Sequence, residues 1–475
     1  MSSDPTTPTP KTPKPKKAGP LRENPRRGKD FKWQTAPVRA PAGMVARDVA
    51  VSALFSVFVE KRAFDDVFNK AADGRHLESR DRGFARLIAA TVLRHHGELR
   101  AVIANCLEKP LPERQGRLEQ ILLAGAAQLL FLDTPPHAAI SLAVDQCRAD
   151  SAAKRFASLT NAVLRRVARE GRDHLATLDA VTLNIPAWLM VRWQAAYGEE
   201  TARAIALASL SEAALDLTVK SDAKVWAERL DGIALKSGSV RIKSAGRIED
   251  LEGYDAGHWW VQDAAAALPA KLLGDIAGKD VADLCAAPGG KTAQLAAAGA
   301  RVTAVDKSPG RLNRLKENLL RLGLDAETYV ADAAEFAPGR LFDAILIDAP
   351  CTATGTIRRH PDILILKRDE DVAALAALQT RILNGAAASL QPGGTLVYCT
   401  CSLEPEEGSA QIDAFLKTHP EFRRAPIDAA ALGLDPAWLS PHGDLRTLPA
   451  HLSELPDGMT GMDGFFAAKL VRAVP

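Results

Sequence analysis

The sequence predicts an α/β fold with a mostly parallel sheet, preceded by an all-α region and a short basic tail. From residue 262 onward, short apolar segments alternate with longer segments of helical periodicity, which is the pattern of parallel strands joined by crossover helices. Between residues 44 and 170 the apolar residues recur only at helical spacing. The chain has 475 residues, too many for one ordinary core, so more than one domain is expected.

Composition changes along the chain define four predicted segments. Residues 1–43 contain nine prolines and ten lysines or arginines against three acidic residues, and they are predicted to form a disordered basic tail. Residues 44–170 are predicted to form a helical domain, residues 171–258 a small α/β connector, and residues 259–475 the α/β domain. The tail favours contact with a polyanion, although a merely solubilising role is an equally open alternative.

The overall composition limits the class of protein. Apolar residues make up 47% and charged residues 25% of the chain, as in soluble globular proteins. The sequence has no apolar run long enough for a membrane span and no signal peptide, so a cytoplasmic protein with no membrane partner and reduced thiols is expected. The six cysteines lack metal-ligand spacing, and no metal site is predicted. We expect a monomer.

The helical domain is predicted from its apolar periodicity, and the connector from mixed signals. Gly125 falls on the apolar face formed by Leu118, Ile121, Leu122 and Leu129, where it would let a neighbouring helix approach closely. Other predicted helices are Ala46–Lys61, Asp81–His95, Ala138–Arg148, Ala157–Ala168 and, in the connector, Pro186–Leu207, with Trp188 and Trp193 in the core. Predicted strands of the connector and just beyond are Leu215–Lys220, Val240–Lys243 and Trp259–Val261.

The α/β domain is predicted to contain five parallel strands followed by a final edge strand. Each parallel strand is short, apolar and bounded by turn residues, as buried parallel strands are. The strands are Val281–Cys285, Val302–Asp306, Glu327–Val330, Ala344–Asp348 and Leu396–Cys399, and Asp463–Leu470 is the predicted edge strand. The helices are Lys291–Ala298, Pro309–Leu322 and Asp371–Leu390.

A turn of small residues follows the first of these strands. The segment Ala286-Ala287-Pro288-Gly289-Gly290 lets the backbone approach a ligand, and the free N–H groups of the helix that begins at Lys291 favour a polar or anionic group. A strand, a glycine turn and a helix in this order predict a nucleotide-type cofactor site. Asp306 at the next strand tip is placed to hold ribose hydroxyls, and Asp332 after the third strand suits an adenine amino group.

Three other interpretations of this turn can be weighed against its residues. Gly290-Lys291-Thr292 resembles the end of a phosphate-binding P-loop, but Cys285 stands where that motif requires glycine. The dinucleotide pattern G-x-G-x-x-G is also absent. An ordinary β–α turn with incidental glycines remains open from the turn alone.

Two further strand ends bring thiols to the same crevice. Asp348-Ala349-Pro350-Cys351 follows the fourth strand, and Thr400-Cys401-Ser402 follows the fifth. In an open parallel sheet the ligand crevice lies beyond the carboxyl ends of the strands, so these side chains are expected to meet the glycine turn there. For each thiol the alternative is a buried, inert cysteine.

The helical segment carries motifs with a recognisable likeness. They are Arg47 with Ala50 and Leu54, Asp81-Arg82-Gly83, the run 123–130, the run 137–140 and the run 160–165. These motifs are similar to the NusB-like RNA-binding domain. The resemblance implies RNA as a partner, with Arg94, Arg165 and Arg166 as candidates for phosphate contact.

The motifs of the α/β domain resemble those of RNA 5-methylcytosine methyltransferases of the Fmu/Sun type. The matching runs are 283–292, 348–351 with 357–363, and 400–402. The resemblance implies a Rossmann-like class I methyltransferase domain that acts on a cytidine in RNA, with small-subunit ribosomal RNA as the expected substrate and tRNA as the alternative. It also implies Cys401 as the nucleophile and Cys351 as a helper in product release. The implied S-adenosyl-L-methionine site consists of Cys285, Ala286, Ala287, Pro288, Gly289, Gly290, Lys291, Asp306, Asp332 and Asp348.

This chemistry explains the need for a thiol. Cytosine carbon 5 accepts a methyl group only after a thiolate has added to carbon 6, and the thiol must therefore be ionised. Asp348 is the candidate for the acid near ring nitrogen 3, and the target base must leave its stack. Cys351 is the alternative nucleophile, as in DNA enzymes with a Pro-Cys turn. Gly408 replaces the family's usual Asn, Cys399 is expected to be a bystander, and a catalytically inactive RNA-binding factor is the alternative function.

Overall fold

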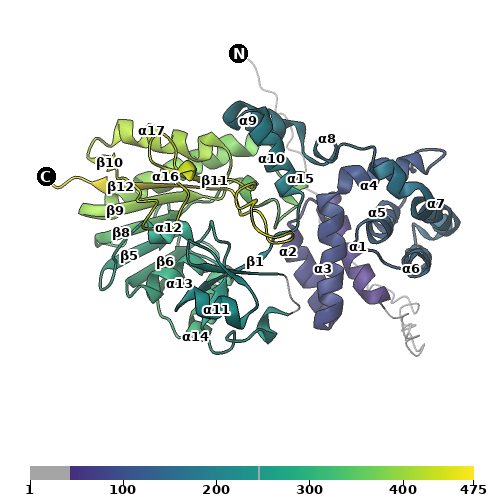
Figure 1. Cartoon of the computed structure of the whole chain (residues 1–475), viewed down its shortest axis with the longest axis horizontal. Coiled ribbons are helices and arrows are strands. Elements are labelled where there is room, and N and C mark those ends of the chain that lie inside the picture. The colour runs from purple at the N-terminus through teal and green to yellow at the C-terminus, as the bar shows by residue number, and fades with distance from the viewer. Residues whose placement is uncertain (1–42, 244–246) are drawn as a thin grey trace, which may run out of the picture. The chain divides into compact units, whose positions relative to one another are not determined.

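The computed structural model describes residues 43–243 and 247–475 (Figure 1). Three regions follow one another along the chain: a helical region, a small antiparallel sheet with its helices, and an α/β region. The prediction of a disordered tail at residues 1–43 lies outside the described residues except for Gly43. No helix in the described part of the chain has the length and hydropathy that crossing a bilayer requires.

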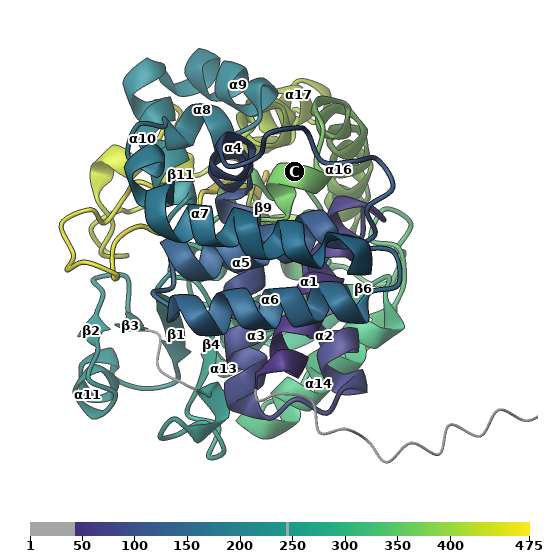
Figure 2. The same cartoon turned by 90° about the vertical axis from the view of Figure 1, so that its right-hand side faces the viewer.

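The helical region is organised around one buried helix. Its helices are α1 (Met44–Phe58), α2 (Phe64–Gly74), α3 (Ser79–Arg94), α4 (His96–Asn105), α5 (Leu118–Leu130), α6 (Pro136–Ala149) and α7 (Ala157–Leu175). Helix α5 contacts α1, α3, α4, α6 and α7 (Figure 2). Every residue of α5 except Glu119 is buried, so the helix is buried on all sides and not, as its spacing suggested, on one face.

Close packing at Gly125 confirms the predicted approach of a neighbouring helix. A Cβ atom at this position would lie 2.7 Å from Cδ1 of the fully buried Leu164 in α7. We therefore expect Gly125→Ala to lower the free energy of unfolding by about 1–3 kcal/mol through overpacking. Gly83, in α3, is exposed, and a Cβ atom there would have no neighbour within 4 Å, so Gly83→Ala is the control and should leave stability unchanged or slightly raised. Urea unfolding of both variants measures the difference; equal midpoints would contradict the packing argument.

The connector contains helices and an antiparallel sheet. Its elements are α8 (Ala180–Asn184), α9 (Ala187–Tyr197), α10 (Glu199–Ser209), β1 (Leu215–Val219), α11 (Ala223–Arg229), β2 (Ile233–Ala234), β3 (Ser239–Ile242) and β4 (Trp259–Val261), with strand order β2-β3-β1-β4. The single helix predicted for Pro186–Leu207 is divided in two at Gly198, whose φ of 81° ends α9. Trp193 is fully buried, whereas Trp188 is only partly buried.

The α/β region forms one sheet with order β10-β12-β9-β8-β5-β6-β7, and β11 also pairs with β12. Strands β5 to β9 are parallel, and β10, β11 and β12 are antiparallel to their neighbours. The strands are β5 (Asp280–Leu284), β6 (Arg301–Asp306), β7 (Glu327–Val330), β8 (Phe342–Asp348), β9 (Leu390–Thr400), β10 (Phe422–Arg424), β11 (Leu445–Thr447) and β12 (Phe465–Arg472). The helices are α12 (Leu268–Lys271), α13 (Gly290–Ala297), α14 (Pro309–Leu322), α15 (Ile363–Leu366), α16 (Asp369–Ser389) and α17 (Ser409–Thr418).

Helices cover both faces of this sheet (Figure 1). Ile345 and Ile347 of β8 pack in the core that includes residues of α16 and α17, whereas Leu346 lies in the core with α12. This alternation is the pleat of a strand buried on both sides. The prediction that the last strand lies at the edge was wrong: β12 pairs with β9 on one side and, on the other, with β10, a strand that the sequence did not predict and that forms the edge.

Candidate active site

The glycine turn is held by the carboxylate of Asp306. The turn follows β5, with Cys285 at φ 65° and Gly289 at φ 105°, and Gly289 is the residue before α13. Asp306, only 2% exposed, accepts hydrogen bonds from the backbone N of Ala287 at 3.2 Å and of Ser308 at 2.9 Å. A Cβ at Gly289 would lie 2.7 Å from Leu315 Cγ, so glycine is required there for both its φ and its close contact with α14.

Asp332 lies at the strand tip where it was predicted, but it is exposed. Its Oδ1 accepts a hydrogen bond from the backbone N of Ala334 at 2.9 Å, which makes a local turn after β7. The turn role is therefore observed. The adenine-binding role of Asp332 stays a prediction.

Cys351 and Cys401 lie side by side, 3.5 Å apart between their Sγ atoms. Both are partly exposed, and they follow the adjacent strands β8 and β9. The contact with Cys401, together with burial, raises the pKa of Cys351 well above its usual value. The sequence predicted that these two thiols share a crevice, and the geometry brings them together.

The other two thiols of this region lie in less reactive surroundings. Cys399 is fully buried, with its Sγ 3.6 Å from Asp348 Oδ1, and burial next to that carboxylate raises its pKa well above the usual value. Burial and the nearby carboxylate of Asp348 raise the pKa of Cys285 to about 12. Both remain thiols at neutral pH, so neither is an effective nucleophile.

A buried ammonium group faces the carboxylate after β8. Lys291, in the first turn of α13, is 7% exposed, and its Nζ lies 2.8 Å from Asp348 Oδ2. Burial opposes the charged form, but Asp348 and the neighbouring thiols raise the pKa of Lys291 above its usual value. The ammonium also lies 4.8 Å from the ring centroid of Phe465 in β12. A permanent positive charge therefore lies beside the two strand ends that carry the thiols.

Asp283, beneath the turn, is buried with one unsatisfied oxygen. Its Oδ2 accepts from Thr292 Oγ1 at 2.6 Å, and Oδ1 meets no partner among the described residues. Burial raises the pKa of Asp283 to about 7. The pKa of Asp283 is higher in the folded than in the unfolded state, so folding favours the protonated carboxyl. The stabilising contribution of this group is therefore fully present below about pH 4 and is lost as the pH rises through 7.

The isosteric change Asp283→Asn removes this titration. We expect it to raise the thermal midpoint more at pH 8 than at pH 5, because the buried charge exists mainly at the higher pH. Thermal unfolding of variant and wild type at both values measures the difference. An equal gain at the two pH values would contradict the raised pKa.

Glu407 joins the two cysteine loops, and sequence reasoning gave it no role. This fully buried carboxylate accepts from the backbone N of Thr352 at 2.9 Å and from Ser402 Oγ at 2.5 Å, the residues directly after the two thiols. Thr352 Oγ1 and Gln379 Nε2 also donate to it. The available signal was the acidic run after Cys401, in which Glu407 is the last member.

The glycine that follows, Gly408, leaves little room for a side chain. A Cβ there would lie 2.9 Å from an Arg446 nitrogen and 3.0 Å from the ring of Phe466. Arg446 in turn donates to the carbonyl of Ser402 at 2.5 Å. The Cys401 loop is thus supported by Arg446 at this point.

A cavity of about 560 Å³ opens at the carboxyl ends of the strands. Of the predicted site residues, it is lined by Ala286, Pro288, Gly290, Lys291 and Asp348. Cys285, Ala287, Gly289, Asp306, Asp332, Cys351 and Cys401 are not part of its lining. Further lining residues, to which the sequence assigned no role in the site, include Trp260, Asp263, Arg314, Arg359, His360 and Asp463.

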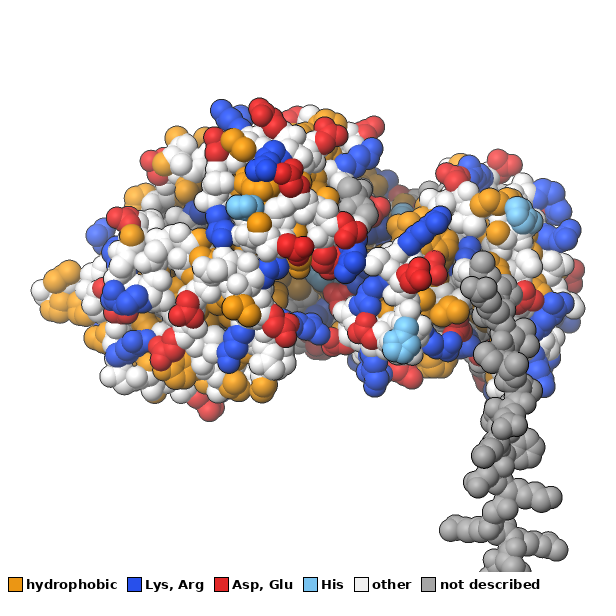
Figure 3. All heavy atoms as spheres, turned by 90° about the horizontal axis from the view of Figure 1, so that it is seen from below, with side chains coloured by type: hydrophobic (Ala, Val, Ile, Leu, Met, Phe, Trp, Pro, Cys, Tyr) orange, Lys and Arg blue, Asp and Glu red, His pale blue; other side chains and the backbone are white. Residues whose placement is uncertain are grey.

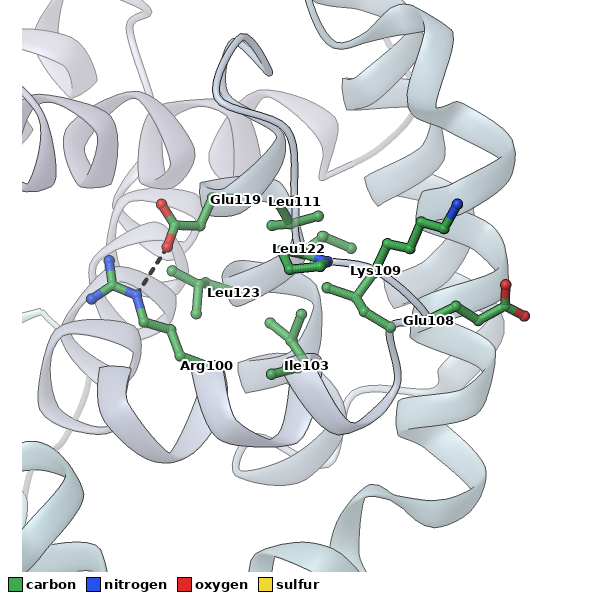
Figure 4. A pocket seen from close by; sticks show the side chains of 11 residues that line it. Arg100, Ile103, Glu108, Lys109, Leu111, Glu119, Leu122 and Leu123 are labelled. Atoms are coloured by element: carbon green, nitrogen blue, oxygen red, sulfur yellow. Dashed lines mark hydrogen bonds and ion pairs between the residues drawn. The ribbon is translucent and has the colours of Figure 1, made fainter.

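A smaller cavity of about 350 Å³ lies in the helical region between α4 and α5 (Figure 4). Its wall is mostly apolar, with Ile103, Leu122 and Leu123, and the ion pair Arg100–Glu119 at 2.9 Å borders it. None of the predicted site residues lines it.

Of the three arginines expected to contact phosphate, Arg94 was wrongly assigned. It is 7% exposed and donates to the carbonyl of Arg358 at 3.2 Å, so it is part of the interior. Arg165 is exposed, and Arg166 is partly exposed and paired with Glu170 at 2.7 Å. Basic and acidic side chains are interspersed on the face of the helical region shown in Figure 3.

A mixed, mostly parallel sheet with a glycine turn after its first parallel strand and helices on both faces is a Rossmann-like architecture, and with the family matches that follow it is a class I methyltransferase domain preceded by a NusB-like helical domain. The family model "16S rRNA methyltransferase RsmB/F" matches residues 271–471, and the NusB family model matches residues 44–169. Together with curated relatives that are 36–39% identical over most of the chain, these matches show that the chain belongs to the RsmB/F family of 16S rRNA methyltransferases.

Curated relatives are similar over nearly their whole length. Ribosomal RNA small subunit methyltransferase B of Xanthomonas campestris pv. campestris is 36% identical over 451 residues, covering 91% of this chain and 98% of the relative. The protein of the same name from Pseudomonas syringae pv. tomato is 38% identical over 450 residues, covering 90% and 97%. That from Xylella fastidiosa (strain 9a5c) is 39% identical over 412 residues, covering 83% and 93%.

Solved structures share the fold. The crystal structure of PH0851 has a TM-score of 0.68 at 23% identity and covers 90% of this chain and 98% of its own. NSun6 from Pyrococcus horikoshii, solved with SFG, has a TM-score of 0.51 at 19% identity and covers 61% and 99%.

Proposed function

We propose that this chain transfers a methyl group from S-adenosyl-L-methionine to carbon 5 of a cytidine in small-subunit ribosomal RNA. Cys401 is the nucleophile, and Cys351 assists release of the product. The observation that supports this proposal most strongly is the pair of partly exposed thiols 3.5 Å apart, at the ends of adjacent strands. Such a pair suits a reaction in which one sulfur forms a bond to the base and the second acts when that bond breaks.

The residues around the cavity fit the proposed methyl donor. The turn from Cys285 to Lys291 ends at the N-terminus of α13, and the cavity of about 560 Å³ opens directly against Ala286, Pro288 and Gly290. Asp348 lines this cavity, and Asp306 and Asp332, outside its lining, supply further carboxylates at the tips of β6 and β7. When bound, the sulfonium of the donor supplies an electrophilic methyl group.

The chain's own residues then account for the remaining chemistry. The Cys401 thiolate adds to carbon 6 of the cytosine, which makes carbon 5 nucleophilic towards the methyl group. Loss of the carbon-5 proton to a base expels the thiolate and restores the aromatic ring. Asp348 is the proposed acid at ring nitrogen 3, and the ammonium of Lys291, 2.8 Å from it, supplies positive charge where negative charge builds up in the adduct.

The helical domain at residues 44–170 is the proposed RNA-binding part, and residues 259–475 the catalytic part. An exposed Arg165 and a partly exposed Arg166 on α7 are available for phosphate contact. Ribosomal RNA as the substrate implies action in the cytoplasm, and we propose a monomer, because cavity, thiols and helical domain are all supplied by one chain.

Mapping 5-methylcytidine in cellular RNA tests the proposal. Small-subunit ribosomal RNA from cells that contain the protein should carry a 5-methylcytidine that is missing from cells without its gene. Returning the gene should restore the modification, and returning a Cys401→Ala version should not. If the modification is unchanged in ribosomal RNA but altered in tRNA, tRNA is the substrate. If neither RNA changes, the proposed methyltransferase activity is refuted.

A further inference from the structure

The segment after Cys351 reaches from the thiols to the helical domain. Residues 357–363 belong to the family-like motif, yet the proposed chemistry uses none of their side chains. At one end, the backbone N of Gly355 donates to the carbonyl of Cys401 at 3.0 Å. Leu403 N donates to Thr354 Oγ1 at 3.0 Å, so this end is fixed against the nucleophile loop. A Cβ at Gly355 would lie 1.9 Å from the carbonyl oxygen of Gly464, so the backbone packs directly against Gly464 where no side chain would fit.

The other end of the segment caps a helix of the helical domain. Asp362 Oδ2 accepts a hydrogen bond from the backbone N of Phe64 at 2.9 Å, across 298 positions of sequence. Phe64 is the first residue of α2, and the preceding Ala63 has no side-chain acceptor for the free N–H groups of that helix. Asp362 therefore satisfies one of the free N–H groups at the start of α2 from another part of the chain, as an N-cap side chain does for the second or third residue of a helix.

Two more contacts join the same segment to the helical domain. His360 Nδ1 lies 3.3 Å from Asp65 Oδ2 in the first turn of α2, and Asp65 also accepts from Arg86 of α3 at 2.6 Å. The buried Arg94 of α3 donates to the carbonyl of Arg358. Directly after Asp362, helix α15 contacts α1 and α3, with Ile365 and Leu366 packed on the core of the helical domain.

The middle of the segment lines the cavity next to Lys291 and Asp348. His360 and Arg359 both line it. Arg359 pairs with Asp463 at 3.1 Å and also with Asp263, two nearly buried carboxylates from opposite ends of the α/β region. About ten residues thus separate the Cys351 thiol from the cap on α2, and contacts fix this stretch along its length.

We propose that the helical domain positions the active site: Asp65 and Asp362 are positioning residues that hold the Cys351–Asp362 loop in register with Cys401. This inference rests on the proposed function and adds a second task for the helical domain besides RNA contact. Its physical basis is that reacting groups must be held within a fraction of an ångström, and a misplacement of about 1 Å costs on the order of a hundredfold in rate. Among the described residues of the compact unit that holds both parts, the Asp362–Phe64 and His360–Asp65 contacts are the polar links between that loop and α2.

Steady-state kinetics of the full chain tests the proposal, with S-adenosyl-L-methionine as donor and, as acceptor, small-subunit ribosomal RNA purified from cells that lack the protein. Asp362→Ala and Asp65→Asn should each lower kcat by about tenfold to a hundredfold while KM for the donor stays within about twofold. Asp362→Asn keeps an acceptor oxygen for Phe64 N and should recover most of the rate. Asp66→Asn is the matched control, because Asp66 lies in the same helical turn but is exposed.

Each other outcome overturns the inference. Rates equal to those of Asp66→Asn would show that the contacts do not position the loop. A raised KM for RNA with unchanged kcat would make these residues part of RNA binding. A rate loss that disappears after correction for the folded fraction, measured by circular dichroism at the assay temperature, would make them merely structural. An inactive wild type would refute the proposed function itself, whereas the first three outcomes leave that function intact.

Discussion

Replacing Cys351 with alanine is expected to trap the protein covalently on its RNA. Cys401→Ala is expected to form no adduct and to lower the rate of methyl transfer by roughly 10⁴-fold or more, the scale seen when a covalent nucleophile is removed. The reason is the division of labour between two sulfurs 3.5 Å apart. Cys401 forms the bond to carbon 6, and without Cys351 that bond persists. Denaturing gel electrophoresis with labelled ribosomal RNA and the methyl donor measures the adduct as a band of reduced mobility.

A remote thiol provides the control for this experiment. Cys106 lies in the helical domain and is nearly buried. The Cys106→Ala variant should form no more adduct than the wild type does. An adduct with Cys401→Ala and none with Cys351→Ala would reverse the assignment and make Cys351 the nucleophile. That result would match the Pro-Cys turn used by DNA cytosine methyltransferases.

Local sequence signals predicted the elements that place the site. The bounds of α14 (Pro309–Leu322) were predicted to the residue, because Ser308 caps its start and Gly323, at φ 62°, ends it. Strands β4 and β7 were also predicted to the residue. The order of strand ends then brought the glycine turn, Asp348 and the two thiols to one edge of the sheet, since parallel strands all present their carboxyl ends there.

Features that depend on distant contacts were not predictable in this way. The interior position of β12 depends on pairing with β9 and β10, which no local pattern specifies. Strand β9 begins six residues before its predicted start, in a Gln-Pro-Gly-Gly stretch that resembles a turn. Arg94 had the sequence environment of a surface residue, and only the tertiary fold buries it against Arg358.

The same limit applies to Glu407, whose role follows only from the folded structure. Three acidic residues follow Cys401 within six positions, and nothing in the sequence distinguishes the buried Glu404 and Glu407 from the exposed Glu406. Glu406 is exposed and pairs with Arg192, while Glu407 is fully buried and accepts hydrogen bonds from both cysteine loops. Adjacent carboxylates therefore have opposite environments, and this contrast provides a matched pair for experiment.

Glu407→Ala is expected to lower the free energy of unfolding by about 3–4 kcal/mol, because the buried donors of Thr352, Ser402 and Gln379 lose their acceptor together. Glu406→Ala breaks an exposed ion pair with Arg192 and should cost less than about 1 kcal/mol. Urea unfolding of the two variants at neutral pH measures this difference. Similar midpoints would show that Glu407 is not the junction of the two loops.

The junction also predicts a loss of activity beyond the loss of stability. Without Glu407, the residues after Cys351 and Cys401 are no longer bonded to one group, so the two sulfurs lose their fixed separation. In a Cys351→Ala background, Glu407→Ala should therefore slow adduct formation by about tenfold or more at a temperature where the protein remains folded. If the double variant forms the adduct as fast as Cys351→Ala alone, the carboxylate of Glu407 does not hold the loop around Cys401. The hydrogen bonds from Arg446 to Ser402 and from Gly355 to Cys401 would then be sufficient to keep its geometry.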